Sequence, residues 1–414
     1  MIRLPLEAAR RVWQARQGLS APQKGPLADV VARTGWLRTL GGVEVYLAMR
    51  ARVPALKRAE LDEASQKLEL QVIPAVRGCI YLVPRAHVPW ALRFAESFFV
   101  KRTGRELEKA GGSWKEVEET AAVALGALGT SALTPDGLRK ALPKGAIRSF
   151  GEQGKRVGLS SPLPLALRLL EFRGEIERTL EGGRLDTERY QWRRSKTSVF
   201  SGAKLPDQLP RLSARLLEIF LEQAAPVTLK DFAGWAGLSL KEASEAAALV
   251  DTAPVAVKGY AEDALVLRNQ LPELERPPQS EAIALLPFDD NFTVSHGGPG
   301  VLVDPEQHAM MVPIWGSSKE TRLGDATHLS YRCIVYRGRV AGFWELDDAK
   351  QRVVTTMFEA LPAKAKRELE ARGADTARFL LEELGHGRCF TLDTDDGVRE
   401  RARKLEAMGG RAGR

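Results

Sequence analysis

Two stretches of the chain show apolar residues at helical spacing followed by segments that alternate in the manner of strands. In the later stretch, Leu212, Leu216 and Ile219 recur at intervals of four and three, which places them on one face of a helix. Thr228 and Ser239 stand where their side chains are suited to cap the next two helices. The elements predicted here are helices at residues 211–222, 229–236 and 240–250 and hairpin strands at 255–260 and 264–267.

The earlier stretch, residues 131–194, has a similar order. Thr134 is placed to cap a short helix, and Gly174 ends a later one. The predicted elements are a helix at 134–139, a basic glycine-rich connector at 143–158, a helix at 160–173 and hairpin strands at 175–180 and 185–192. Paired helices followed by a hairpin are the order of a winged helix. The helix at 160–173 is therefore the recognition-helix candidate, and the hairpin is the candidate wing.

The two ends of the chain follow less regular patterns. The first part predicts helices at 6–17, 26–34 and 43–52 and a strand at 77–84. After a linker at 275–280, the pattern predicts strands at 282–286, 310–315, 331–336 and 339–345, a helix at 363–384 and a basic, glycine-rich end that frays. We therefore predict an α+β chain of three tandem winged-helix domains followed by a C-terminal β-barrel-like domain with a helix, at residues 1–110, 111–204, 205–275 and 276–414.

The positive charge of the chain is concentrated in the second of these domains. Residues 139–204 hold fifteen Lys and Arg against seven Asp and Glu, a net of +8 that equals the net charge of all 414 residues. A local basic surface favours a phosphate backbone because neutralised phosphates release counterions, so double-stranded DNA is the expected partner. Arg184, at the hairpin tip, is suited to a minor groove. The candidate DNA contacts are Lys155, Arg156, Arg168, Arg173, Arg184, Arg189, Arg193 and Arg194.

Composition argues against several other classes of protein. No apolar run approaches the roughly 20 residues that span a bilayer, and the start of the chain has no signal-peptide core. We expect a cytoplasmic monomer without a membrane partner, associated with the nucleoid when it binds DNA. Cys79, Cys333 and Cys389 show no metal-ligand spacing and no P-loop is present, so neither a metal nor a nucleotide cofactor is expected. Residues 289–291 are expected to form a capped turn rather than a metal site.

Four short segments occur in a recognisable order: LGGVEVY at 40–46, RGCIYLVP at 77–84, LPFD at 286–289 and YRGRVAGFW at 336–344. In this order they resemble the AlkZ/YcaQ-like winged-helix DNA glycosylases of bacteria. The resemblance implies three winged-helix domains and a C-terminal β-barrel-like domain that together grip duplex DNA. It also implies excision of alkylated or crosslinked bases by hydrolysis of the N-glycosidic bond, and a structural or DNA-facing role for Asp289.

The catalytic candidates come from the same resemblance. The family's Gln-x-Gln or Gln-x-Asp signature is replaced here by Glu44 and Tyr46, and the histidine of its Arg-Gly-Thr-x-His strand is replaced by Tyr81. A carboxylate can deprotonate water and stabilise positive charge on the sugar, so Glu44 is the candidate base. On a regular helix Glu44 and Tyr46 diverge by about 200°, so joint action requires a helix start or a distortion.

Two functions therefore stay open at the level of sequence. One is a DNA N-glycosylase with an altered Glu-x-Tyr motif. The other is a non-enzymatic DNA-binding or regulatory relative that has lost glycosylase activity, because duplicated winged helices need no catalysis.

Overall fold

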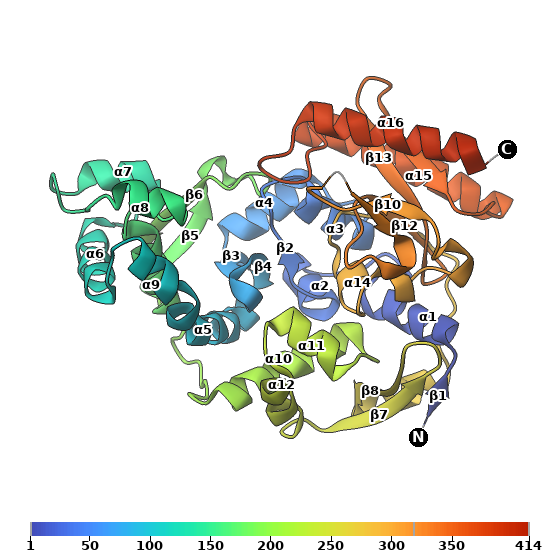
Figure 1. Ribbon diagram of the computed structural model, residues 1–414, viewed down its shortest axis with the longest axis horizontal. Helices are drawn as coiled ribbons and strands as arrows, with labels where there is room; N and C mark the ends of the chain where they lie inside the picture. Colours follow the sequence, from blue (N-terminus) through green and yellow to red (C-terminus); the bar gives the residue numbers. More distant parts are fainter. Residues whose placement is uncertain (1, 318, 413–414) are drawn as a thin grey trace.

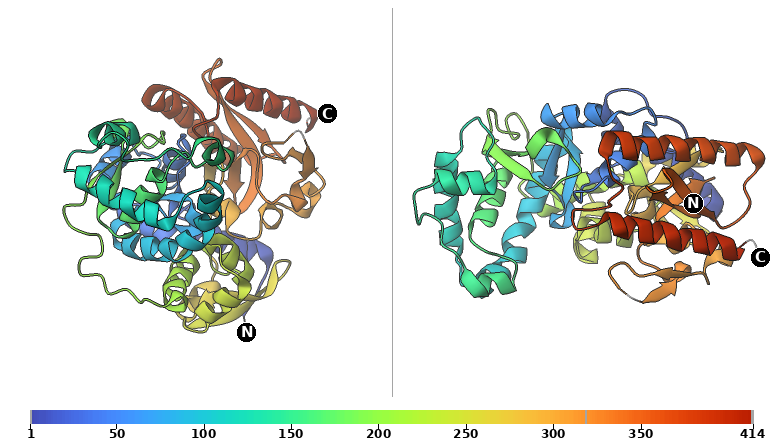
Figure 2. Two further views of the ribbon diagram at one scale, coloured as in Figure 1. Left: turned by 60° about the vertical axis from the view of Figure 1, so that its left-hand side comes forward. Right: turned by 90° about the horizontal axis from the view of Figure 1, so that it is seen from above.

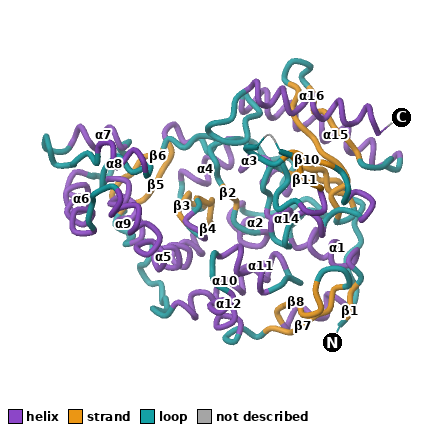
Figure 3. Tube along the Cα trace, viewed as in Figure 1, coloured by secondary structure: helices purple, strands orange, loops and turns teal. Residues whose placement is uncertain are grey.

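The computed structural model describes residues 2–317 and 319–412 and shows an α+β chain in which helices surround several small sheets (Figure 1). Helices are the commonest element of the trace, and the strands lie in short groups between them (Figure 3). Among the described residues, no helix is both long and apolar enough to cross a membrane. The α+β prediction is confirmed.

The first unit is built around a small antiparallel sheet. Its elements are β1 (Arg3–Leu4), α1 (Leu6–Arg16), α2 (Leu27–Thr34), β2 (Leu37–Arg38), α3 (Glu44–Arg52), α4 (Arg58–Gln66), β3 (Leu70–Pro74) and β4 (Ile80–Pro84), with the sheet order β2-β4-β3. Helices α1, α2 and α3 and strand β4 agree with the sequence prediction, which lacks α4 and β3. Helix α4 buries only Leu61, Asp62 and Ala64, so it offers little apolar periodicity to detect.

A 22-residue helix, α5 (Val88–Lys109), leads from this sheet to the basic unit at the left of Figure 1. The basic unit contains α6 (Trp114–Ala127), α7 (Pro135–Ala141), α8 (Gly151–Arg156), α9 (Leu163–Phe172), β5 (Ile176–Leu180) and β6 (Tyr190–Arg194). Thr134 caps α7 as predicted and accepts a hydrogen bond from the Gly137 amide at 3.0 Å. The connector prediction is wrong in part, because α8 lies inside residues 143–158. Two glycines among its six residues give this helix a low propensity.

The third unit follows its prediction most closely. It comprises α10 (Leu209–Ala224), α11 (Leu229–Ala236), α12 (Leu240–Ala247), β7 (Thr252–Val257), β8 (Ala261–Leu267) and α13 (Leu271–Leu274). Thr228 and Ser239 cap α11 and α12 through hydrogen bonds from backbone amides at 3.1 and 3.3 Å. Strand β1 pairs in parallel with β7, so the first residues of the chain complete the sheet of this third unit.

The C-terminal part contains an open sheet of order β14-β13-β12-β9. Its elements are β9 (Ile283–Leu286), α14 (Asn291–Val294), β10 (Met311–Pro313), β11 (Glu320–Arg322), β12 (Arg332–Tyr336), β13 (Arg339–Asp347), β14 (Arg352–Met357), α15 (Ala363–Arg378), a π-helical turn (Phe379–Leu384) and α16 (Asp395–Ala412). The β-barrel-like prediction is therefore wrong. The end strands β14 and β9 do not pair with each other, so the sheet stays open. Every residue of β9 and β12 is buried, so the sheet is covered on both faces there.

The end of the chain also differs from its prediction. Residues expected to fray form α16, which packs on β13 and β14 beside α15 (Figure 2). Val398, Ala402 and Leu405 are buried at intervals of four and three, so a short apolar face inside this basic segment holds the helix in place.

Helix α3 joins the first unit to the C-terminal sheet. Seven of its nine residues are buried, so it lies inside the protein instead of exposing one face. The residue before its cap, Gly42, approaches the chain so closely that a Cβ there would lie 2.3 Å from the carbonyl carbon of Cys389. The amide of Val43 also donates to the carbonyl of Arg388 at 2.9 Å. The start of α3 is thus fixed against residues 388–390.

Gly42→Ala is expected to lower the free energy of unfolding by about 1–3 kcal/mol, because the new methyl would overlap backbone atoms that have no rotamer to move to. Gly126→Ala is the matched control, since Gly126 lies exposed near the end of α6 with open space around it. The control should be neutral or stabilising by up to about 1 kcal/mol. Urea unfolding followed by circular dichroism measures both, and equal midpoints would contradict this packing.

Candidate active site and nucleic-acid interface

Glu44, the first residue of α3, is a buried and fully engaged carboxylate. Its side chain is 4% exposed. One oxygen accepts hydrogen bonds from the Arg332 guanidinium, with Nε at 3.0 Å, and the other accepts from the Phe288 amide at 2.5 Å. Burial raises the pKa of Glu44, and the Arg332 cation opposes that shift. Both oxygens therefore serve the packing of α3 on the C-terminal sheet.

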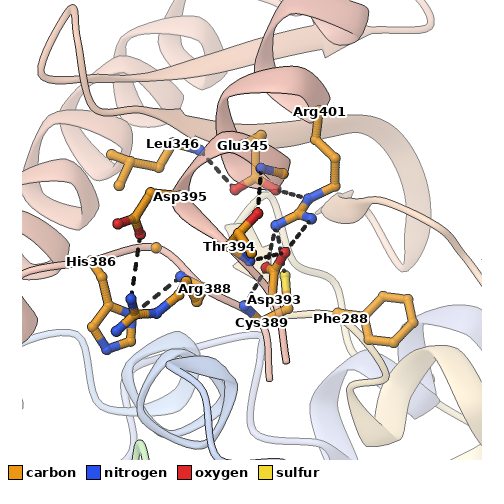
Figure 4. Close-up of polar contacts among 12 residues, drawn as sticks. Phe288, Glu345, Leu346, His386, Arg388, Cys389, Asp393, Thr394, Asp395 and Arg401 are labelled. Atoms are coloured by element: carbon orange, nitrogen blue, oxygen red, sulfur yellow. Dashed lines mark hydrogen bonds and ion pairs between the residues drawn. The ribbon is translucent and has the colours of Figure 1, made fainter. Parts of the chain in front are cut away.

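The Glu44–Arg332 pair begins a longer chain of buried charges. Arg332 also donates to Glu345 and to the carbonyl of Gly387 at 2.7 Å. Glu345 accepts from Arg401 at 2.7 Å, and Arg401 continues to Asp393 at 2.7 Å (Figure 4). The network links α3, the sheet and α16, which is a structural arrangement. Glu44 is 4% exposed and both of its oxygens accept hydrogen bonds, so the role of water-orienting base does not fit its geometry.

Tyr46 lies on the same helix and points elsewhere. Its hydroxyl donates to Asp62 and accepts from the Leu185 amide at 2.8 Å. Burial raises the pKa of Tyr46, and the neighbouring Asp62 carboxylate raises it further. Glu44 thus faces the C-terminal sheet while Tyr46 faces the hairpin of the basic unit, as their spacing predicts. The structure does not bring the three predicted catalytic residues together, because Tyr81 belongs to a different site.

Tyr81 lines a cavity of about 230 Å³ where the first, third and C-terminal units meet. On the sheet, Tyr81 of β4 lies opposite Arg38 of β2. The Arg38 guanidinium donates to Oδ2 of Asp289 at 2.6 Å, and Nδ1 of His328 lies 3.6 Å from Oδ1. The cavity is lined by Arg38, Arg77, Tyr81, Lys230, Asp231, Gly234, Trp235, Asp289, Asn291, Val294, Gly297, Gly298, Thr327 and His328. We call it the central cavity.

Two residues of the central cavity hold unusual backbone conformations. Asp289 has a φ of 55° and Arg77 has a φ of 58°, in the left-handed region that non-glycine residues rarely adopt. Five non-glycine residues of the described chain have positive φ, and these two line the same cavity. Such strain costs energy and gathers at functional sites. It identifies the Asp289 carboxylate, whose side chain is 10% exposed, as a positioned group.

The next residue, Asp290, has a different role. Its carboxylate receives two hydrogen bonds from buried Arg52, at 2.8 and 3.0 Å, and caps α14 by accepting from the Phe292 amide at 3.0 Å. The predicted capped turn is therefore present at this position. Asp290 stabilises the turn that aims Asp289 into the central cavity.

Tyr81 and Asp289 belong to motifs that the sequence shows, whereas no local pattern marks Arg38 or His328 as a site residue. Strand β2 has only two residues, so no alternation marks Arg38 as a strand residue facing Tyr81. His328 follows Asp289 by almost forty residues, which include α14, β10 and β11. Only the folded structure brings these side chains together.

The predicted DNA contacts of the basic unit fall into two groups. Exposed ones are Lys155, Arg156, Arg173, Arg189 and Arg194. Arg184 is held by Asp186 and donates to the Leu384 carbonyl at 3.0 Å, so it is not a free hairpin tip. Arg193 is paired with Glu177 at 2.5 Å. These two side chains tie the hairpin to its surroundings.

The recognition-helix prediction for residues 160–173 needs correction. Helix α9 buries eight of its ten residues, so most of its surface packs inside the basic unit. Arg168 is half-buried on it, and burial lowers the pKa of Arg168 to about 10. The exposed cations lie instead on α8, at the C-terminal end of α9 (Arg173) and along the hairpin.

Comparison with known proteins gives the class of this fold. Residues 40–379 match the family model described as DNA glycosylase AlkZ-like, and they span most of the chain. The protein belongs to the AlkZ-like family of DNA glycosylases, which is a class of DNA-binding repair hydrolases. The family resemblance inferred from the sequence is confirmed.

One solved structure and one negative result complete the comparison. DNA glycosylase AlkZ from Streptomyces sahachiroi is similar to this chain, with 21% sequence identity, coverage of 91% of this chain and 97% of that chain, and a TM-score of 0.70. At that identity the likeness shows a shared fold. No curated protein matches the sequence.

Glu44→Gln is expected to lower the free energy of unfolding by about 3 kcal/mol, because it leaves Arg332 buried with a weaker partner. Glu63→Gln, on the exposed face of α4, is the matched control and should stay within about 0.5 kcal/mol of wild type. Chemical denaturation measures both. A stable Glu44→Gln variant that has lost only activity would restore the catalytic interpretation of Glu44.

Proposed function

We propose that the protein is a DNA N-glycosylase that binds double-stranded DNA and hydrolyses the N-glycosidic bond of an alkylated or crosslinked base. Membership of the AlkZ-like family supports the reaction class. The observation that carries the proposal is Asp289, which has a strained backbone, lines the central cavity and has its carboxylate held by Arg38. The cavity is smaller than a typical drug-sized pocket, and its size suits a single extruded base.

The proposed chemistry uses the carboxylate as a general base. Water attacks C1′ of the sugar while the bond from C1′ to the base nitrogen breaks, and that nitrogen keeps the electron pair. Asp289 accepts the proton of the water and stabilises the positive charge that develops on the sugar. Arg38 occupies Oδ2, which leaves Oδ1, beside His328, to face the water. Arg38 is thus a positioning residue.

The other predicted catalytic residues take different parts in this proposal. Tyr81 stays a site residue, because burial raises its pKa and keeps the phenol protonated beside Arg77. A neutral hydroxyl at this wall can donate a hydrogen bond to an extruded base. Glu44 and Tyr46 are proposed to hold α3, and with it the site, in place.

The DNA path proposed here uses the exposed cations of the basic unit. Lys155 and Arg156 on α8 and Arg189 and Arg194 on the hairpin are suited to phosphates, which fix the duplex without reading its sequence. Such contacts fit a cytoplasmic protein associated with the nucleoid. The non-enzymatic alternative is favoured by one observation, the ion pair that already occupies one oxygen of Asp289.

Asp289→Asn is expected to reduce base excision at least 100-fold, since the amide cannot accept the proton of the attacking water. Duplex DNA containing 7-methylguanine is incubated with the protein and treated with alkali, and strand breaks are counted. Asp396→Asn is the matched control, because Asp396 is exposed on α16 and does not line the central cavity, and it should keep full activity.

Affinity for the same duplex, measured by gel shift, should be unchanged in Asp289→Asn. Activity within twofold of wild type in Asp289→Asn would remove Asp289 from the chemistry. A wild-type protein that shifts DNA and yields no breaks would favour the non-enzymatic alternative.

A further inference from the structure

The basic unit carries a second hollow that the central cavity does not include. It is a groove of about 590 Å³ between the end of α7 and the start of α9, formed largely by the loop at residues 143–149. Its polar lining consists of Arg139, Lys144, Arg148, Ser149, Ser160 and Ser161. We call it the α7–α9 groove. Helices α7 and α9 lie at the left of Figure 1, away from α15 and α16.

We propose that the α7–α9 groove binds one backbone phosphate of the DNA, outside the nucleotide that enters the central cavity. The inference rests on the proposed function in that it takes DNA as the ligand. It adds a site and a set of residues that lie beyond the predicted DNA contacts.

Charge is the first argument for an anion. Three cationic side chains line the groove, and no Asp or Glu lines it. Lys144 is exposed, and no carboxylate in the described part of the chain lies within 4.0 Å of its ammonium group. Arg148 is held by both oxygens of Glu116 and by the Gly111 carbonyl, so its position at the rim is fixed. Arg139 is likewise paired with Asp136 at 2.9 Å, so the unpaired positive charge of the groove comes from Lys144.

Ser161 supplies the second, independent argument. Its side chain is 5% exposed, and its hydroxyl has no hydrogen-bond partner among the described atoms. A buried hydroxyl without a partner costs about 1–3 kcal/mol, so a ligand with acceptor oxygens would satisfy it. Ser161 stands just before α9, a ten-residue helix whose positive N-terminal dipole also favours an anion. An unmet donor and the charge of the groove thus point to the same ligand.

The shape of the groove favours a phosphodiester over a free phosphate. The loop at 143–149 is mostly exposed, so the groove is open to a chain that enters and leaves it. Side-chain hydroxyls, cationic side chains and helix N-termini are the groups that contact backbone phosphates, and the open groove offers all three. Exposed Lys155 and Arg156 on α8 belong to the same unit and can take neighbouring phosphates. The contact would be independent of DNA sequence.

The test compares variants of the groove on unmodified duplex DNA. Lys144→Ala should weaken binding about fivefold and reduce the slope of log affinity against log salt by about 1. Ser161→Asp should weaken binding about tenfold or more, because a carboxylate would face the phosphate, while Ser161→Ala should weaken it less. Lys404→Ala is the matched control, as Lys404 is exposed on α16, and it should leave the slope unchanged. Fluorescence anisotropy at several salt concentrations gives these values, and circular dichroism melting checks folding.

Two further measurements separate the outcomes. Single-turnover excision at saturating protein should be normal in Lys144→Ala, whereas Asp289→Asn should bind DNA normally and lose excision. The groove proposal and the glycosylase proposal can therefore fail independently. Millimolar inorganic phosphate should not raise the melting temperature of the wild type. An unchanged salt slope in Lys144→Ala together with unchanged affinity in Ser161→Asp overturns the proposal. A second result would also overturn it: phosphate raises the melting temperature of the wild type, and Ser161→Ala abolishes that rise without changing affinity for duplex DNA. The groove would then bind free phosphate.

Discussion

The buried ion pair between Glu44 and Arg332 is the interaction on which the arrangement of this protein depends. It fixes the start of α3 to β12 of the C-terminal sheet, and through Glu345 and Arg401 it reaches α16. Charges that have left water are stable only when each one is matched, so the network permits one relative placement of these elements. That placement brings the turn at Asp289 next to the first sheet.

The central cavity is a consequence of that placement. Arg38 and Tyr81 come from the first sheet, Asp289 and His328 come from the C-terminal part, and Trp235 comes from the third unit. No single unit of the chain contains the site. The strained backbone at Asp289 persists because Asp290, paired with Arg52, anchors the turn from behind. Asp290 and Glu44 thus stabilise the fold, whereas Asp289 is the candidate for the chemistry.

Local patterns in the sequence predicted those elements whose signals lie within a few residues. The caps at Thr134, Thr228 and Ser239 stand where the sequence places them, since a cap depends on its own side chain and the next turn. Helices with weak patterns were missed: α8 contains two glycines, and α16 looks like a basic tail. The barrel-like prediction failed because a segment that predicts a strand does not show which other strand it pairs with.

The sequence by itself determined the family, the α+β class, most helices of the third unit and the local excess of positive charge, because each depends on residue identity or short-range order. Only the tertiary structure decided which carboxylate is structural and which is available. Glu44 sits at the motif position, but burial beside Arg332 engages both of its oxygens. Asp289 reads as a turn residue, yet contacts from β2 and His328, far away in the chain, place it in a cavity. The physical reason is that desolvation and ion pairing are set by long-range neighbours.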